Sequence, residues 1–239
     1  MTGRLEIGGA GAPVEIANGT LIKAGPGSLV LAGDNTYNGE TRINAGTIVL
    51  TGMLSGTSLI NVAPGATFDV SGVAGGYTLN SFQVLAGGGK LDGNVLANGA
   101  ISPGDVGFGT LHFGANLTLT GSADFEIGKA GPALLSDLAE VTGELIYGGT
   151  LNVSATGQPL SDGEVFNLFD AATFGGTFTA FNLPFLDPGL FWDTSNLTVD
   201  GTIIVIPEPG SGVAIAVGLA FSIVGVRPRR RVGSCKALR

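Results

Sequence analysis

Short apolar runs separated by glycine-containing turns recur along the first half of the chain, and they constrain its fold more than any other feature. Runs that begin at Thr47, Thr67 and Lys90 are followed by a fourth at Gly109, so each unit is about 20 residues long. A unit of that length cannot bury its own apolar side chains, but stacked units bury one another's. The spacing therefore predicts a solenoid whose successive coils pair their strands.

The composition favours strands throughout the body of the protein. The 239 residues include 42 Gly, and only 13% of them are charged. Before residue 206, no stretch carries the mixture of Ala, Leu, Glu and Lys that is typical of a long helix. Val, Ile and Thr are common instead, between turns built on Gly, Asn and Asp. We therefore expect an all-β fold, and an α/β enzyme is disfavoured.

The charges are divided unevenly between the body and the C-terminal end. Residues 1–206 hold five Lys or Arg residues and 18 Asp or Glu residues, a net charge of −13. Residues 207–239 hold six basic residues and one acid, a net charge of +5. A body this acidic repels phosphate backbones, so we predict no nucleic-acid partner.

The C-terminal end has the pattern of a membrane span. Residues 210–226 form an uncharged run of 17 residues. A helix of this length would extend about 25 Å, close to the thickness of a membrane's hydrocarbon core. An arginine cluster follows at once and is typical of a stop-transfer signal: Arg227, Arg229, Arg230 and Arg231. A buried core helix is the alternative, but it would not end in four arginines. We predict a single C-terminal transmembrane helix.

The tripeptide Pro207, Glu208 and Pro209 stands immediately before this run. The order of tripeptide, apolar span and arginine cluster resembles the PEP-CTERM sorting signal. The resemblance implies that exosortase, a membrane-embedded protease and transpeptidase, recognises the tripeptide. It also implies an exported precursor anchored in the inner membrane and a mature form at the cell surface or outside the cell. Because Met1 to Gly9 contain no export signal, we expect the natural start to lie upstream.

A second resemblance lies within residues 20–50. Alternate positions carry the residues Gly27, Leu29, Leu31, Gly33, Asn35, Tyr37, Gly39 and Thr41, and the strand Gly46-Thr47-Ile48 follows. This pattern resembles the passenger-associated repeat of autotransporters. The resemblance implies a right-handed parallel β-helix on a secreted surface protein, in which the repeat aids export and folding.

We expect three parts: a β-solenoid repeat region over residues 1–105, a β-rich continuation and cap over 106–206, and the sorting tail over 207–239. Strands are expected in the second part at Thr177–Phe181 and Leu197–Val199, among others. Large rings gather there: Phe166, Phe169, Phe174, Phe178, Phe181, Phe185, Phe191 and Trp192. We interpret them as a cap that closes the last coil, since an open solenoid end needs protection. A sugar-stacking platform is the alternative.

No pattern in the sequence indicates catalysis. Asp124 and Glu126 share a strand face, as the carboxylates of a glycosidase would, but such pairs arise by chance among 18 acids. His112 has no nearby nucleophile and is interpreted as a strand-surface residue. Cys235, the single cysteine, lies beyond the arginine cluster, and metal-ligand clusters are absent from the sequence. We predict no catalytic residues, no metal site and no cofactor.

These observations predict an exported, non-enzymatic cell-surface or extracellular-matrix protein of a bacterium, of the adhesin or biofilm kind. Its expected partners are exosortase, the membrane through the C-terminal helix, and an extracellular polysaccharide. The alternative is a carbohydrate-active enzyme, a polysaccharide lyase or hydrolase, on the same β-helix scaffold. A further alternative is that the chain forms one end of a longer adhesin.

Overall fold

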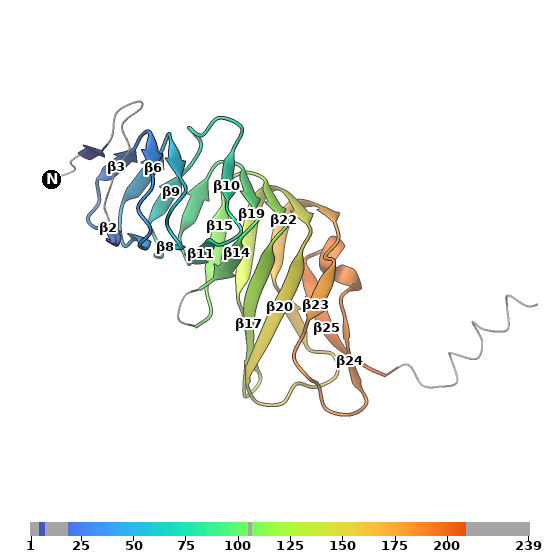
Figure 1. Ribbon diagram of the computed structural model, residues 1–239. Helices are drawn as coiled ribbons and strands as arrows, with labels where there is room; N and C mark the ends of the chain where they lie inside the picture. Colours follow the sequence, from blue (N-terminus) through green and yellow to red (C-terminus); the bar gives the residue numbers. More distant parts are fainter. Residues whose placement is uncertain (1–4, 8–18, 105–106, 209–239) are drawn as a thin grey trace, which may run out of the picture. The chain divides into compact units, whose positions relative to one another are not determined.

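The computed structural model describes residues 5–7, 19–104 and 107–208 (Figure 1). Strands dominate these residues, and a single turn of 3-10 helix, η1 (Ser195–Thr198), is the one helical element among them. The chain divides into two units, residues 1–206 and 207–239, and only Pro207 and Glu208 of the second are described. The expectation of an all-β fold is confirmed.

Strands of successive coils pair in parallel to form a nine-stranded sheet (Figure 1). Its path is β2 (Leu21–Lys23), β5 (Thr41–Ile43), β8 (Leu59–Val62), β11 (Val84–Gly87), β14 (Ala100–Pro103), β17 (Ser122–Ala130), β20 (Thr150–Gly157) and β23 (Ala180–Asn182). One more strand, β18 (Ala133–Ser136), turns back along β17 in the antiparallel direction. Because each strand pairs with the strand one coil away, the backbone groups of neighbouring coils satisfy one another.

A second sheet of 11 strands covers two further sides of the coils. Its first part contains β1 (Leu5–Ile7), β3 (Ser28–Leu31), β6 (Thr47–Leu50), β9 (Thr67–Asp69), β12 (Lys90–Asp92), β15 (Thr110–Phe113), β19 (Leu138–Tyr147) and β22 (Phe169–Gly176). Its second part contains β16 (Leu117–Leu119), β13 (Val95–Ala97) and β10 (Tyr77–Leu79). The ten residues of β19 join the two parts, because its first half pairs with β15 and its second half with β16.

Two small sheets complete the fold. The strands β4 (Asp34–Asn35) and β7 (Met53–Leu54) pair in parallel beside the first coils. At the end of the body, β21 (Val165–Asn167), β25 (Thr202–Pro207) and β24 (Leu190–Asp193) form a three-stranded sheet. The strand expected at Leu197–Val199 was wrong, since Leu197 lies in η1. Its carbonyl there accepts a 2.8 Å hydrogen bond from the hydroxyl of Tyr147.

The register confirms the coil spacing for three units and corrects it for the fourth. Thr47 is paired with Thr67, and Thr67 with Lys90, as the sequence pattern predicted. The next partner of Lys90 is His112, three residues beyond the expected Gly109. The observed register sets Leu91 opposite Phe113, so both apolar side chains point inward. Pairing Lys90 with Gly109 would instead have set Leu91 opposite Thr110, a polar residue, at the inward-pointing position.

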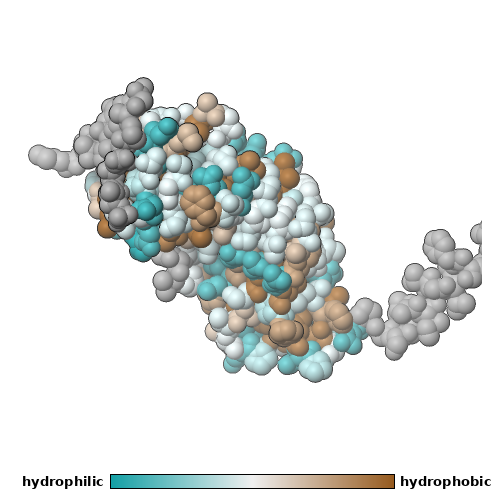
Figure 2. All heavy atoms as spheres, in the orientation of Figure 1, coloured by the Kyte–Doolittle hydropathy of each residue, from teal (hydrophilic) through white to brown (hydrophobic). Residues whose placement is uncertain are grey.

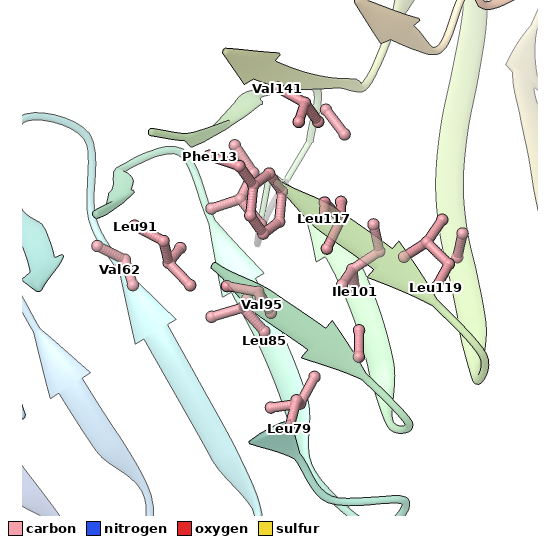
Figure 3. Close-up of a cluster of buried hydrophobic side chains, with 14 of the residues drawn as sticks. Val62, Leu79, Leu85, Leu91, Val95, Ile101, Phe113, Leu117, Leu119 and Val141 are labelled. Atoms are coloured by element: carbon pink, nitrogen blue, oxygen red, sulfur yellow. The ribbon is translucent and has the colours of Figure 1, made fainter. Parts of the chain in front are cut away.

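One continuous core fills the coils (Figure 3). The side chains of Phe68, Leu91, Phe113 and Val141 are at most 2% exposed and follow one another in register from β9 to β19. Figure 3 shows Leu85, Ile101 and Leu119 entering the same interior from the other sides of the coils. Burial of each such side chain contributes about 1.5–3 kcal/mol to folding. No coil has a core of its own, so each coil depends on its neighbours for stability.

The described residues contain no helix of the length and apolarity required to cross a membrane. The span expected over residues 210–226 lies outside them, and the boundaries expected at 105/106 and 206/207 remain predictions.

Candidate functional site

The repeat motif builds a corner that joins two coils. Asn35 is fully buried, and its Nδ2 donates hydrogen bonds to the carbonyl oxygens of Gly33, at 3.2 Å, and of Met53, at 2.9 Å. Met53 belongs to β7 in the next coil. The asparagine of the motif therefore ties one coil to the following one.

The tyrosine and threonine of the motif continue the same corner. The hydroxyl of Tyr37 lies 2.7 Å from Oγ1 of Thr41, which donates to Oγ1 of Thr57 at 3.2 Å. Thr57 in turn donates to the carbonyl of Gly39 at 2.6 Å. Burial raises the pKa of Tyr37 to about 12, against the opposing effect of its hydrogen bond to Thr41. These groups are engaged with one another inside the protein, so the motif is structural.

Asp124 and Glu126 lie side by side on β17, as their spacing predicted, and they line a shallow groove of about 310 Å³ with Asn152 and Ser154. Asp124 accepts a hydrogen bond at each carboxylate oxygen, from Asn152 Nδ2 at 2.6 Å and from Ser122 Oγ at 3.2 Å. Asn182 Nδ2 donates to Asn152 Oδ1 at 2.6 Å in the next coil. Asp124 is thus the base of a ladder of polar side chains that runs across three coils.

His112 lies on the outer face of β15, as expected, but it has a partner that the sequence did not reveal. Its Nδ1 is 2.8 Å from Oε2 of Glu140 on β19, and both side chains are about half exposed. In the coil before, Nζ of Lys90 is 2.6 Å from Oδ1 of Asp92. The register places Lys90, His112 and Glu140 next to one another on three successive coils.

Lys90, His112 and Glu140 line a groove of about 460 Å³. Its polar walls are Thr67, Lys90, His112, Glu140 and Thr142, and glycines make up much of its floor: Gly65, Gly88, Gly89 and Gly114. Sequence reasoning missed the groove. The run that contains Gly88, Gly89 and Lys90 is visible in the sequence, but its partners come from coils that are 20 or more residues away.

Asp137 is a buried acid that no sequence pattern indicated. It is 1% exposed, and its two carboxylate oxygens accept hydrogen bonds from the backbone amides of Gly109, at 2.9 Å, and Glu126, at 2.7 Å. Burial raises its pKa to about 6; the two hydrogen bonds oppose that shift, and the charge of Glu126 adds to it. Asp137 joins the turn before β15 to the middle of β17, so its role is to hold the chain together.

The eight crowded aromatic residues fall into a buried group, an exposed group, and Phe174 and Trp192, which are partly buried against the core. Phe166, Phe169 and Phe178 are buried, and Phe169 and Phe178 pack on Tyr147 with ring centres 5.1 and 4.8 Å apart from it. This group closes the last coils and supports the interpretation as a cap. The rings of Phe181, Phe185 and Phe191 are exposed by 43% or more.

The sorting residues lie at the limit of the described chain. Pro207 ends β25 and is exposed, as is Glu208. Pro209, Arg227, Arg229, Arg230 and Arg231 lie outside the described residues. Within the part of the chain that the structure describes, no three His, Cys, Asp or Glu side chains gather as metal ligands would.

Comparisons with known proteins relate the chain to autotransporters. The family model described as passenger-associated-transport-repeat matches residues 21–50, which confirms the resemblance expected there. The chain is 33% identical over 187 residues to the adhesin BmaC autotransporter of Brucella suis biovar 1, covering 74% of this chain and 5% of that protein. It is 31% identical over 176 residues to the autotransporter lipoprotein NalP of Neisseria meningitidis serogroup B, covering 72% of this chain and 14% of that protein. The chain therefore spans a small part of each relative.

Proposed function

We propose that this chain, which carries a passenger-associated-transport repeat, is an exported, non-enzymatic protein of the bacterial surface or extracellular matrix, with an adhesin-like role. The observation that supports this proposal most is that the polar residues of the repeat motif make hydrogen bonds inside the stack of coils. Asn35, Tyr37 and Thr41 are buried, and their hydrogen bonds hold the coils together, as expected of a scaffold. In this proposal the parallel stack is a right-handed β-helix that acts as a scaffold.

Similarity to an adhesin autotransporter supports the same location and role. A protease-accessibility experiment on intact cells of the native host tests it. We expect added proteinase K to remove the mature protein while a cytosolic marker stays intact. Protection in intact cells, followed by digestion only after lysis, would refute the proposed location.

The proposed route to the surface uses the C-terminal tail. Residues 210–226 would span the inner membrane, Arg227, Arg229, Arg230 and Arg231 would hold the end in the cytoplasm, and exosortase would recognise Pro207, Glu208 and Pro209. Pro207, the last residue of β25, and Glu208 after it are exposed, and this exposure supports access by a protease.

Mass analysis of the C-terminus in cells with and without exosortase tests this route. We expect a shortened C-terminus only where exosortase is present, and an intact one in Glu208→Ala. Asp187→Ala, at an exposed acid of the body, is the matched control and should be processed normally. An identical intact tail in both kinds of cell would exclude sorting by exosortase.

A carbohydrate-active enzyme remains the second candidate, because Asp124 and Glu126 line one groove. The ladder argues against it, since both carboxylate oxygens of Asp124 are occupied by hydrogen bonds from the protein itself. We expect no release of reducing ends from a panel of polysaccharides. Release that disappears in both Asp124→Ala and Glu126→Ala would establish the enzyme instead.

A further inference from the structure

We propose that the groove over β9, β12, β15 and β19 binds an uncharged polysaccharide in an extended form. This inference rests on the proposed surface role and names the site and the ligand class for it. The groove volume of about 460 Å³ lies in the range of ligand-binding clefts.

The register arranges the polar groups of the groove in a line. Thr67, Lys90, His112 and Glu140 are paired strand to strand, so each coil presents one of them on the same face. Neighbouring strands in a sheet are about 4.8 Å apart, and the row therefore repeats polar groups at nearly even steps across four coils. A linear polymer with a repeated unit suits such a row better than a compact ligand does.

The chemistry of the row suits hydroxyl groups. The ion pairs Lys90–Asp92 and His112–Glu140 hold donors and acceptors in place, while the four side chains remain 38–51% exposed. Thr67 and Thr142 add hydroxyls that both donate and accept. A sugar hydroxyl, which also does both, can pair with every member of this set.

Charge and burial argue against other classes of ligand. Glu140 in the row, Asp92 paired with Lys90 beside it, and the net charge of −13 over residues 1–206 disfavour an anionic polymer. A protein partner would need an apolar centre in the contact. The apolar residues of this groove, Ala66 and Phe113, are each 1% exposed and offer none. Figure 2 shows residues of intermediate hydropathy over much of the face in view, with no single apolar area covering it.

Glycines line much of the groove: Gly65, Gly88, Gly89 and Gly114. A Cβ added at Gly65 would meet no atom within 4 Å, whereas a Cβ at Gly89 or Gly114 would overlap atoms of the neighbouring coil. A sugar ring can therefore approach the backbone closely at Gly65.

Affinity electrophoresis of the full chain tests the inference. The chain is run in a polyoxyethylene detergent through gels that contain hydroxyethylcellulose, mixed-linkage β-glucan or galactomannan, with polygalacturonate as the anionic comparison. We expect at least one neutral polymer to slow the protein and polygalacturonate to leave it unaffected. The proposal is overturned if no neutral polymer slows the chain or if polygalacturonate slows it most.

Two pairs of matched variants locate the site. Thr67→Trp fills the groove, whereas Thr47→Trp adds the same ring on the same row one coil earlier, outside the groove lining. Glu140→Ala removes a wall acceptor, whereas Glu144→Ala removes an exposed acid of the same strand that does not line the groove. We expect Thr67→Trp and Glu140→Ala to lower the affinity about tenfold, and the two controls to leave it within about twofold.

Equal retardation of all four variants and the unmodified chain would place binding elsewhere and overturn the inference. Glu140 is exposed, so the Glu140→Ala result decides even if Thr67→Trp does not fold. The proteinase K result on intact cells does not depend on this groove. Surface exposure without glycan binding would overturn only the site, and loss of surface exposure would overturn the proposed function.

Discussion

Asn152 on β20 donates a 2.6 Å hydrogen bond from Nδ2 to Oδ1 of Asp124 on β17, and the two residues are paired in register. Asn182 repeats the same donation to Asn152 one coil later. The ladder therefore fixes three successive coils to one another from the outside. The core holds them together from within.

The first prediction concerns this ladder. Asn152→Ala removes the donor to Asp124 and the acceptor for Asn182, so two hydrogen bonds are lost together. We expect the free energy of unfolding to fall by about 1–2 kcal/mol in urea titrations of the folded body. Asn44→Ala, at an exposed asparagine in the turn after β5, is the control and should change it by less than about 0.5 kcal/mol. Equal effects of the two changes would mean that the ladder adds no stability.

The second prediction concerns Asp137 and pH. The folded state raises the pKa of Asp137 to about 6, above the value of about 3.9 in an unfolded chain. The folded state therefore binds the proton more tightly, and the contribution of Asp137 is fully present below pH 4 and is lost as the pH rises towards 6. The expected loss is about 2 kcal/mol between pH 4 and pH 7.

Asp137→Asn provides the comparison, because an amide resembles the protonated acid and does not titrate. We expect the stability of Asp137→Asn relative to the unmodified chain to increase as the pH rises from 4 to 7. Urea titrations at four pH values give this difference. A difference that stays constant over the range would show that the carboxyl is ionised throughout.

The third prediction concerns Lys23, which is 8% exposed. Its Nζ donates to the carbonyl oxygens of Gly25, at 2.7 Å, and Ala45, at 3.0 Å, and so joins two turns. Lys23→Met keeps the alkyl chain and leaves these carbonyls without their donor. We expect a loss of about 1–3 kcal/mol in the free energy of unfolding. Lys90→Met, at a half-exposed lysine, should cost less than about 1 kcal/mol, and equal costs would contradict the prediction.

The fourth prediction concerns Gly46, which has φ of 74°. A Cβ at this position would overlap the carbonyl oxygen of Gly27 in the coil before. Gly131 also has positive φ, at 62°, but a Cβ there would meet no atom within 4 Å. We expect Gly131→Ala to cost about 1 kcal/mol through backbone strain alone and to lower the melting temperature accordingly. We expect Gly46→Ala to lower the melting temperature clearly further. Equal melting temperatures would show that the turn can move aside.

Part of the fold follows from local patterns. The runs at Thr47, Thr67 and Lys90 have the spacing of the observed register, because each places one apolar residue after a turn and the next coil repeats it. The sequence pattern placed the fourth run at Gly109, three residues before the observed partner of Lys90. The glycine-rich turn before β15 resembles the start of a strand in the sequence. The observed register there places Leu91 opposite Phe113, and both side chains are buried.

The candidate sites were less accessible to sequence reasoning. The shared strand face of Asp124 and Glu126 followed from strand geometry, and both residues line one groove. The ion pair of His112 with Glu140 joins residues that are far apart in the chain, and no local pattern marks either as the partner of the other. The two backbone amides that donate to Asp137 belong to Gly109 and Glu126, which are distant from it in the sequence. No local pattern therefore distinguishes Asp137 from the other acids.

The sequence alone determined that this chain forms short strands between glycine turns, that they stack as coils, and that a passenger-associated-transport repeat occupies residues 21–50. These properties are local, since they depend on which residues tolerate a turn and which prefer a strand. The tertiary structure decided which polar residues of different coils meet, and with them the groove, the ladder and the raised pKa of Asp137. Coil lengths vary, and a shift of one residue turns a side chain from the interior to the surface, so only the packed register brings these groups together.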